Sequence, residues 1–319
     1  MNWKNSCILG LALLLIVACG DDEEQIAELI PPRLLSEVAV ENDEEIRTFL
    51  STHFYNYEEF ANPPADFDYK IRFDTIAGDN ADKVPILDSP ELIIENISVA
   101  SSDFGRADDE IVEHPLYVLV AKQGAVEGLP TIGDNVIISY TGSLLNGIGF
   151  DASANQPVRF NLSGVVRGFG NGMEYFQTGN GPIENGDGTV SYDDFGIGVI
   201  FMPSGLGYLD RPPSTLIPSY APLVFKIDAF AFEENTDFDG DGIPSILEDV
   251  DGDGNLNNDN TDSELEPNTV FLPNYNDPDD DNDGILTIDE IELDADGNFV
   301  GFLDTDGDKI LDHLDNDAL

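Results

Sequence analysis

Residues 133–232 constrain the fold more than any other part of this chain. They contain segments with apolar residues at alternate positions, separated by turns rich in glycine and proline. In NVIISYTGSLL (135–145), Val136, Ile138 and Tyr140 recur at every second position, so they point to one side of a strand. YVLVAK (117–122) predicts a preceding strand, and the polar residues between the two segments predict a turn-rich connection.

The same region carries four motifs: GDNVIISYTGSLLNGIGFD (133–151), VRFNLSGVVRGFGNGMEYF (158–176), PSGLGY (203–208) and IPSYAPLVFKIDAF (217–230). In residues and in order they resemble the FKBP-type peptidyl-prolyl cis-trans isomerases, over about a third of the chain. The resemblance implies an α+β fold, in which an antiparallel sheet of five or six strands wraps around one short helix. We expect this isomerase domain to occupy residues 115–234.

The resemblance also implies a substrate pocket. Carried over residue by residue, the catalytic positions are Tyr140, Phe150, Asp151, Phe160, Val165, Val166, Phe169, Tyr208, Ile217 and Phe225. By analogy with the family, the backbone N–H of Val166 and the hydroxyl of Tyr208 would orient the carbonyls beside the proline. Asp151 would hold tyrosine hydroxyls such as that of Tyr140, or meet the twisted carbonyl.

Three features depart from the family pattern. Phe169 stands where the family usually has tryptophan, and Leu209 follows the tyrosine where the family has glycine. Residues 179–194 are an insertion, which we expect either to form a flap near the pocket or to decorate a sheet edge. The expected helix also contains three glycines, each of which costs up to about 1 kcal/mol relative to alanine in a helix interior: Gly168, Gly170 and Gly172.

Such residue types suit the isomerisation of an X-Pro bond. Rotation about an amide is limited by a barrier of ~18–20 kcal/mol because the C–N bond has partial double-bond character. No bond breaks, so the reaction needs no nucleophile and no cofactor. An apolar aromatic pocket excludes water and favours the twisted amide, which is less polar than the planar one. We therefore expect an enzyme that assists the folding of exported proteins, with proline-containing unfolded or exported chains as partners.

Two alternatives to that interpretation remain. Aromatic residues in a small barrel often do no more than fill its core, although Asp151 and Tyr208 are costly to bury among aromatics unless they are paired. The pocket could also be degenerate. The chain would then be a non-catalytic FKBP-like chaperone, or a calcium-dependent surface scaffold or adhesion module.

Residues 1–19 predict an export signal. Lys4 gives a weak positive start, the apolar run CILGLALLLIVA is short for a membrane span, and Cys19 follows the small Ala18. This resembles a bacterial lipoprotein signal, in which Cys19 would be lipidated and become the mature N-terminus. An uncleaved N-terminal anchor is the alternative. Loss of Cys7 with the signal would leave no thiol for a disulfide or a zinc site.

We expect residues 20–40 to form an acidic tether. The run GDDEEQ directly after Cys19 resembles the surface-export signal of Bacteroidetes lipoproteins, and a solvated spacer is the alternative. The expected location is the cell envelope, as an outer-membrane lipoprotein that is periplasmic or surface-exposed. Two or three acyl chains on one cysteine would give a stable membrane anchor.

Residues 41–114 predict a small α/β extension. Asn42 or Asp43 is a plausible helix N-cap, the pair Pro63 and Pro64 would end the helix, and apolar residues recur at helical spacing: Ile46, Phe49, Leu50 and Phe54. Strands are expected in DYKIRFDTI (68–76) and ELIIENISVA (91–100). The extension either packs against the isomerase domain and extends its sheet, or serves as a dimerisation or substrate-cradling module.

The charge of the chain is strongly negative, with 64 acidic against 13 basic residues and a net charge of −51. Phosphate contacts need clustered lysine and arginine, so this balance argues against nucleic acid and anionic lipid as partners. It favours multivalent cations. Residues 233–319 hold 29 of the 64 acids and a single base, Lys309.

Aspartates alternate in this C-terminal region, which we take as residues 235–319. Two segments match the twelve-residue calcium loop, with ligands at positions 1, 3, 5, 7 and 12 and glycine at 6. The predicted metal ligands are Asp237, Asp239, Asp241, Ile243 and Glu248 in the first loop, and Asp279, Asp281, Asp283, Ile285 and Glu290 in the second. The segments that begin at Asp249 and at Asp304 match less well, since Asn260 and Lys309 replace the expected glutamate and glycine.

The aspartate pattern resembles the thrombospondin type 3-like repeats of bacterial surface proteins, or more distantly dockerin repeats, because no helix is predicted before either loop. We expect an arm of little regular structure that structural calcium ions stabilise. Without calcium, repulsion between carboxylates should keep the arm expanded. A disordered acidic tail is the alternative.

Overall fold

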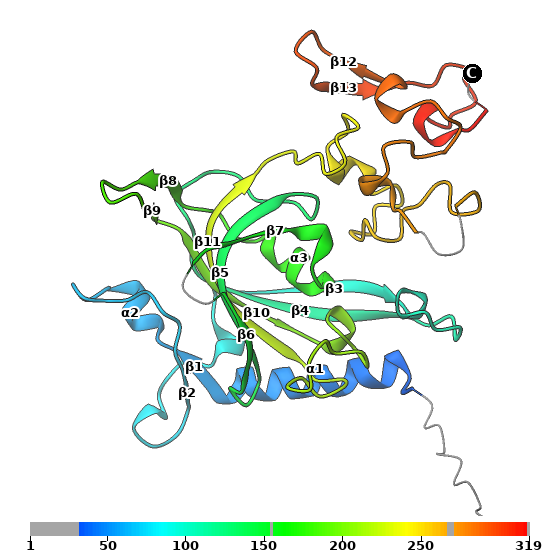
Figure 1. The fold of residues 1–319 in the computed structure, drawn as a ribbon. Coiled ribbons are helices and arrows are strands. Elements are labelled where there is room, and N and C mark those ends of the chain that lie inside the picture. The colour runs from blue at the N-terminus through cyan, green and yellow to red at the C-terminus, as the bar shows by residue number, and fades with distance from the viewer. Residues whose placement is uncertain (1–31, 154–155, 267–270, 318–319) are drawn as a thin grey trace, which may run out of the picture. The chain divides into compact units, whose positions relative to one another are not determined.

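A seven-stranded antiparallel sheet organises the protein (Figure 1). The computed structural model describes residues 32–153, 156–266 and 271–317. The strand order is β3-β4-β10-β11-β5-β6, and β7 also pairs with β5. The strands span Leu92–Ala100 (β3), Ile111–Lys122 (β4), Asn135–Leu144 (β5), Gly149–Ala152 (β6), Val158–Asn161 (β7), Gly196–Met202 (β10) and Leu223–Glu233 (β11). A mixed, sheet-rich fold with few helices is confirmed.

Helix α3 (Arg167–Met173) packs against this sheet. Phe169 and Met173 are buried together with Val136 and Ile138 of β5. The helix glycines, which the sequence suggests only weaken it, permit this close contact. A Cβ atom on Gly172 would lie 2.6 Å from Cδ1 of Ile200 on β10, and one on Gly168 would lie 2.9 Å from Cβ of Leu206.

Helix α1 (Leu35–Thr52) differs from the prediction at both ends. It begins well before Asn42, and it ends before strand β1 (His53–Tyr55), not at Pro63. The N-cap residue has no side-chain cap of its own, and Glu110 accepts hydrogen bonds from the backbone N–H groups of Leu35 and Ser36 at 2.8 and 3.3 Å. Asn42 is a buried residue within the helix, so the N-cap prediction was wrong.

Asn42 instead links α1 to the motifs at 203–208 and 217–230. Its Oδ1 accepts hydrogen bonds from the backbone N–H and the hydroxyl of Ser204, and its Nδ2 donates to the carbonyl of Tyr220. Both partners lie far along the chain. A buried amide that is hydrogen-bonded across the core through both its oxygen and its nitrogen explains why this position is polar within an otherwise apolar helix face.

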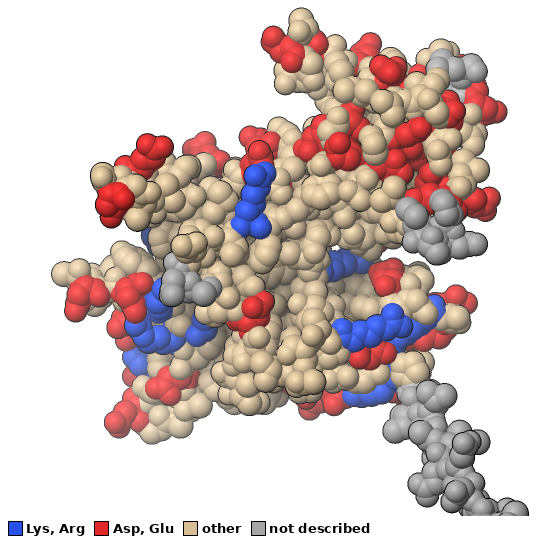
Figure 2. Space-filling view, in the orientation of Figure 1, with Lys and Arg blue, Asp and Glu red and all other residues tan. Residues whose placement is uncertain are grey.

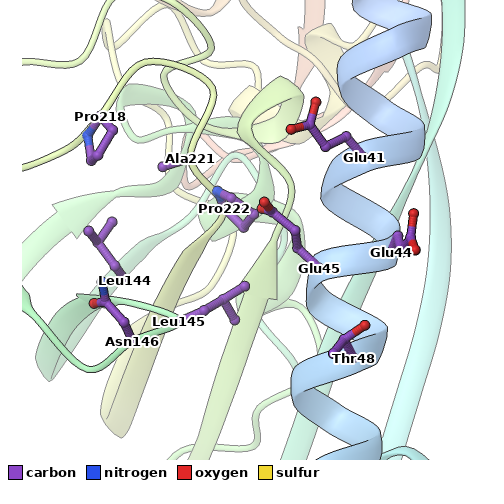
Figure 3. Close-up of a pocket in the computed structure, with 10 residues that line it drawn as sticks. All are labelled: Glu41, Glu44, Glu45, Thr48, Leu144, Leu145, Asn146, Pro218, Ala221 and Pro222. Atoms are coloured by element: carbon purple, nitrogen blue, oxygen red, sulfur yellow. The ribbon is translucent and has the colours of Figure 1, made fainter.

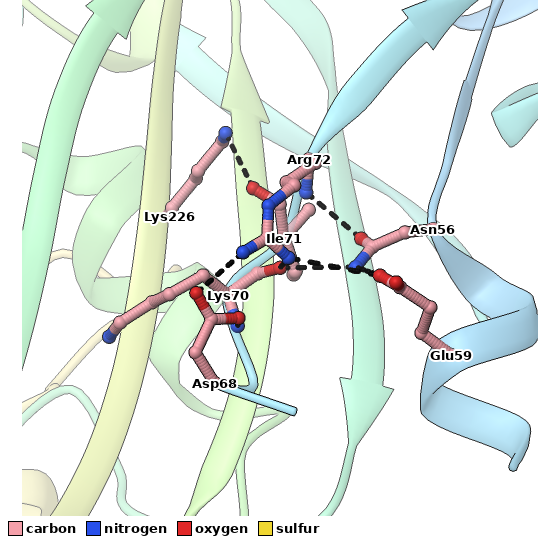
Figure 4. A network of polar contacts seen from close by, with 7 residues as sticks. All are labelled: Asn56, Glu59, Asp68, Lys70, Ile71, Arg72 and Lys226. Carbon is pink, nitrogen blue, oxygen red and sulfur yellow. Dashed lines mark hydrogen bonds and ion pairs between the residues drawn. The ribbon is translucent and has the colours of Figure 1, made fainter. Parts of the chain in front are cut away.

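The remainder of the N-terminal segment is held against β11. Helix α2 spans Tyr57–Ala61 and strand β2 spans Phe73–Thr75, which is shorter than the predicted strand 68–76 and pairs with β1. Figure 4 shows the polar contacts around it: Lys226 of β11 donates to the carbonyl of Ile71, and Asn56 accepts from the backbone N–H of Arg72. Strand β3, predicted within 91–100, extends the main sheet by pairing with β4.

The insertion at 179–194 forms a hairpin of strands β8 (Asn180–Glu184) and β9 (Val190–Asp193). Gly188 has a φ of 83° in its turn, a conformation that glycine adopts readily. Tyr192 stacks on Phe230 of β11, with ring centroids 5.1 Å apart. The hairpin therefore packs on the end of β11 that lies beyond Phe225.

Residues 235–317, apart from 267–270, consist mainly of turns and short 3-10 segments, with one small hairpin of β12 (Ile291–Leu293) and β13 (Phe299–Phe302). Acidic side chains are concentrated over this region (Figure 2). No helix among the residues that the structure describes is long and apolar enough to cross a membrane. The predicted signal, Cys19 and most of the predicted tether lie outside the described residues.

Candidate functional site

Five aromatic rings from five different elements converge on one side of the sheet. Tyr140 of β5 lies 5.6 Å from Phe160 of β7 and 6.1 Å from Phe225 of β11, measured between ring centroids. Phe169 of α3 packs edge-on against Phe225 at 5.2 Å, and Phe150 of β6 does so at 5.6 Å. We call these five residues the aromatic cluster. The antiparallel pairing of β5 with β6, β7 and β11 brings four of them together.

Four further predicted pocket residues pack in the same apolar core as the aromatic cluster. Ile217 is buried, whereas Val165, Val166 and Tyr208 are partly buried. Val165 and Val166 immediately precede α3, and the carbonyl of Val166 accepts a hydrogen bond from the backbone N–H of Phe169 at 2.8 Å. The segment before the helix therefore forms part of the wall that Phe169 completes.

Asp151, the tenth predicted residue, lies at the exposed edge of the cluster. The hydroxyl of Tyr140 donates a hydrogen bond to Oδ2 of Asp151 over 2.6 Å. Burial, the hydrogen bond to Asp151 and its charge raise the pKa of Tyr140 above its ordinary value, and burial together with the Asp151 charge raises that of Tyr208. Both phenols are therefore kept protonated, as hydrogen-bond donors, well above neutral pH.

Leu209 adopts the conformation that glycine would favour at this turn. Its φ is 48°, in the left-handed region, and its backbone N–H donates to the carbonyl of Ser204 at 2.9 Å. The side chain of Leu209 is 1% exposed. Burial of the leucine side chain offsets the cost of the left-handed backbone, so Tyr208 keeps its place beside the aromatic cluster.

A separate hollow lies between α1 and the β5–β6 turn (Figure 3). Its volume is about 530 Å³, and three acidic residues of α1 line one side: Glu41, Glu44 and Glu45. Leu144, Leu145 and Pro222 line the opposite side. None of the ten predicted pocket residues borders this hollow.

The predicted calcium loops bring their carboxylates together. Asp237, Asp239 and Asp241 each place an oxygen within 4.8 Å of the others, and a second group of this kind consists of Asp279, Asp281 and Asp283. Glu290 is buried, and its pKa is raised to about 7 by burial and by neighbouring aspartates that include Asp281. The side chain of Ile243 is fully buried, whereas Ile285 is partly exposed.

A third group joins the two loops. Asp241 and Glu248 of the first loop meet Asp280 of the second, and all three are at most 3% exposed. Within the described part of the chain, neither carboxylate oxygen of Glu248 or of Asp280 has a hydrogen-bond partner. Burial, followed by the charge of Asp241, raises the pKa of Glu248 to about 11 and that of Asp280 to about 9. Carboxylates so buried are costly to ionise unless a cation neutralises them.

These orphaned oxygens fit a hard cation such as Ca²⁺, which takes six to eight oxygen ligands. The sequence did not indicate Asp280, because its position in the second loop is not a ligand position of that loop. It also missed the group formed by Asp262, Glu266 and Asp277, whose spacing matches no calcium motif. Only the packing of one loop on another brings such residues together.

Comparisons with known proteins identify relatives of part of this chain. A family model described as FKBP-type peptidyl-prolyl cis-trans isomerase matches residues 127–181. FK506-binding protein 1 of Dictyostelium discoideum is 30% identical over 120 residues, which are 36% of this chain and 96% of that protein. The peptidyl-prolyl cis-trans isomerase Mip of Coxiella burnetii is 28% identical over 119 residues, 37% of this chain and 44% of Mip.

Among solved structures, a peptidyl-prolyl cis-trans isomerase from Pseudomonas syringae is similar, with 20% identity and a TM-score of 0.32. The match covers 46% of this chain and 84% of that one.

Proposed function

The chain belongs to the family of FKBP-type peptidyl-prolyl cis-trans isomerases, and from this premise we propose that the aromatic cluster is the pocket in which it twists an X-Pro bond. The proline ring lies against Phe169 and Phe225, which close the buried end of the cluster. Water is excluded from the amide there, and the twisted amide, being less polar than the planar one, is favoured over the ground state.

Polar groups at the edge of the cluster complete the mechanism. The backbone N–H of Val166 and the hydroxyl of Tyr208 orient the carbonyls on either side of the proline. Asp151 holds the Tyr140 hydroxyl through their hydrogen bond, and in the proposed mechanism its carboxylate can instead meet the twisted carbonyl. No proton moves and no covalent bond breaks, so these groups act by position and by charge.

The observation that carries this proposal is the hydrogen bond between Tyr140 and Asp151 at the edge of five converging aromatic rings. Packing of the rings alone does not require this carboxylate, which lies exposed at the edge of the cluster and fixes the direction of the only hydroxyl among the five rings.

The test measures the cis-to-trans conversion of a Phe-Pro peptide by residues 20–319, with the variants Asp151→Ala and Tyr208→Phe. We expect each variant to lose about tenfold in kcat/KM, which corresponds to the loss of one hydrogen bond worth about 1.4 kcal/mol, while the circular dichroism spectrum stays unchanged. The exposed Glu264→Gln is the matched control and keeps full activity. Unchanged catalysis in both pocket variants would move the active site elsewhere and leave the cluster as core.

The proposed setting is the bacterial cell envelope, where the enzyme assists the folding of exported proteins. A lipid on Cys19 anchors the mature chain to the outer membrane, on its periplasmic or its outer face. The support is the sequence of residues 1–25. Metabolic labelling with a palmitate analogue tests it: the label should enter the wild-type protein and not Cys19→Ala, and equal labelling of both would refute lipidation.

The C-terminal region is proposed to bind structural calcium. The support is the set of buried carboxylate oxygens that lack a hydrogen-bond partner within the described residues, in Asp241, Glu248, Asp280, Asp281 and Glu290. The first ion is held by Asp237, Asp239, Asp241 and Glu248 with the carbonyl of Ile243. The second is held by Asp279, Asp281, Asp283 and Glu290 with the carbonyl of Ile285. Calorimetry should show several ions bound per chain. No heat at millimolar calcium would indicate an acidic tail without a cation role.

A further inference from the structure

One acidic loop contacts both ends of the segment that carries Val165 and Val166. Asn257 donates a hydrogen bond from Nδ2 to the carbonyl of Ser163 over 2.9 Å. Arg167 donates from Nη2 to the carbonyl of Asp253 over 2.7 Å. Residues 249–259, which we call the clamp loop, therefore contact the chain on both sides of the two valines, at Ser163 and at Arg167.

The clamp loop carries its own group of carboxylates. Asp249, Asp251 and Asp253 place oxygens within 4.8 Å of one another. Gly254 donates its backbone N–H to Asp249 Oδ2 at 3.0 Å, just as Gly242 does to Asp237 in the first predicted calcium loop. The two loops thus share one backbone arrangement, although the sequence of the clamp loop matches the calcium motif less well.

Asp259 gives an independent indication of a cation. Its side chain is 6% exposed, and its Oδ1 accepts hydrogen bonds from the backbone N–H groups of Val250 and Asp251 at 3.1 and 3.3 Å. These contacts hold the carboxylate at the backbone between Asp249 and Asp251, yet Oδ2 is buried and finds no hydrogen-bond partner in the described chain. Asp249 Oδ1 is likewise buried without a hydrogen-bond partner among the described residues. Two orphaned anionic oxygens on one site are unfavourable unless a cation binds between them.

Asp259 also takes the place of the glutamate that the calcium motif has at its last ligand position and that the clamp loop lacks. Position 12 counted from Asp249 is Asn260, which the calcium motif does not accept, and the carboxylate one residue earlier takes its place. The site therefore has four carboxylates, which suit a hard divalent cation.

We propose that Asp249, Asp251, Asp253 and Asp259 bind a calcium ion, and that this ion positions the Val165–Val166 wall of the proline pocket. The calcium site is inferred from the contacts and burial of the clamp loop alone and does not depend on the function of the pocket. The effect on the pocket rests on the function proposed above for the aromatic cluster.

Arg167 transmits the position of the clamp loop to the pocket. Its guanidinium is largely buried and lies 3.5 Å from Asp253 Oδ2 and 3.7 Å from Asp103 Oδ2. Arg167 is also the first residue of α3, the helix that carries Phe169. Without the ion, repulsion among the four carboxylates displaces Asp253, and the arginine loses the carbonyl to which it donates. Arg167 is thus a positioning residue and not a catalytic one.

The first experiment counts calcium ions by titration calorimetry on residues 20–319. Asp259→Asn and Asp251→Asn should each bind one ion fewer than the wild type, or bind it about tenfold more weakly, as expected when one charged ligand is lost. Asp251 is exposed, so its replacement tests the site even if Asp259→Asn fails to fold. The exposed Glu264→Gln removes one charge from the same region and should bind as the wild type does. Unchanged stoichiometry and affinity in Asp251→Asn would overturn the site.

The second experiment measures isomerase activity with saturating calcium and with a chelator. In the wild type we expect calcium to raise kcat/KM about tenfold, chiefly through KM, because the pocket wall becomes ordered before the peptide binds. Asp251→Asn should lose this response. Arg167→Gln should bind all its calcium and still lose the response, and Arg167→Lys should restore part of it. A full calcium response in Arg167→Gln would overturn the coupling.

The two proposals fail in different ways. A protein that binds calcium at the clamp loop and shows no isomerase activity under either condition retains the ion site and refutes the pocket. Equal activity with and without calcium, in a protein whose clamp loop binds the ion, refutes only the coupling.

Discussion

The hydroxyl of Tyr140 and the carboxylate of Asp151 are joined by a hydrogen bond of 2.6 Å, between a half-buried ring and an exposed acid. The phenol belongs to the floor of the aromatic cluster and the acid to its edge. The pair therefore connects the apolar and the polar parts of the proposed site.

We predict that these two residues are energetically coupled in catalysis. Tyr140→Phe and Asp151→Asn should each lower kcat/KM, and the double variant should lose less than the sum of the single losses, with a coupling of about 1–2 kcal/mol. Stability should change by no more than ~1 kcal/mol, because the acid remains hydrated when the hydroxyl is removed. A double-mutant cycle on both kcat/KM and urea unfolding measures this. Strict additivity in kcat/KM would show that the two groups act independently.

Gly142 should be essential to the shape of the pocket. A Cβ atom at this position on β5 would lie 2.6 Å from Phe150 and 3.0 Å from Phe225. Gly142→Ala should therefore push these rings apart, destabilise the fold by about 1–3 kcal/mol and lower activity. Gly164→Ala is the matched control, since a Cβ there meets nothing within 4 Å. Equal behaviour of the two variants would contradict this account of the pocket.

Acidification should destabilise the protein through His114. This histidine is fully buried, neither ring nitrogen has a hydrogen-bond partner within the described residues, and burial and then Arg167 lower its pKa to about 4. In the unfolded chain, His114 takes up a proton near pH 6.5. In the folded protein, His114 stays neutral until the pH falls to about 4. The His114 contribution to stability is therefore complete above about pH 6.5 and is lost as the pH falls towards about 4.

The measurement is urea unfolding of the wild type and His114→Leu at about pH 7 and pH 5, where this histidine accounts for a loss of up to about 2 kcal/mol. Other groups titrate in both proteins, so the difference between them isolates His114. The variant should lose less stability on acidification than the wild type does. An identical loss in both would show that the histidine is protonated in the folded state.

The sequence predicted the strands at 117–122 and 135–145, because local alternation carries that information, and its resemblance to the FKBP-type family implied that the aromatic residues converge. It could not predict where α1 begins. That end is fixed by Glu110, which lies far along the chain and accepts hydrogen bonds from Leu35 and Ser36. The sequence around Asn42 is typical of a helix N-cap. In the structure Asn42 lies inside the helix, where its side chain forms hydrogen bonds with Ser204 and Tyr220.

The same limit applied to the acidic region. The alternating aspartates identified each loop by itself, since those residues are close in sequence. Asp280 meets Asp241 and Glu248 only because the second loop packs against the first. Asp259 accepts backbone N–H groups from the start of its own loop, and no spacing rule indicated it. Sites built between loops require the folded arrangement.

Asp280 provides a prediction in which the sign of the effect depends on calcium. Asp280 lies in a buried group with Asp241 and Glu248, and without a cation burial and then the charge of Asp241 raise its pKa to about 9. At neutral pH it is therefore protonated in the folded protein and ionised in the unfolded chain, which lowers the stability of the fold. Asp280→Asn should raise the thermal midpoint in a chelator, because it removes this cost. In saturating calcium the same change should lower the midpoint, since a ligand is lost; each shift corresponds to about 1–3 kcal/mol.

Differential scanning calorimetry of residues 20–319 measures both midpoints. Glu264→Gln, which removes an exposed acid of the same region, should shift neither. A group of carboxylates that served only to keep the region soluble would give shifts of the same sign with and without calcium, because the ion would have no preferred place among them. Opposite signs require that an ion bind where the three buried carboxylates meet.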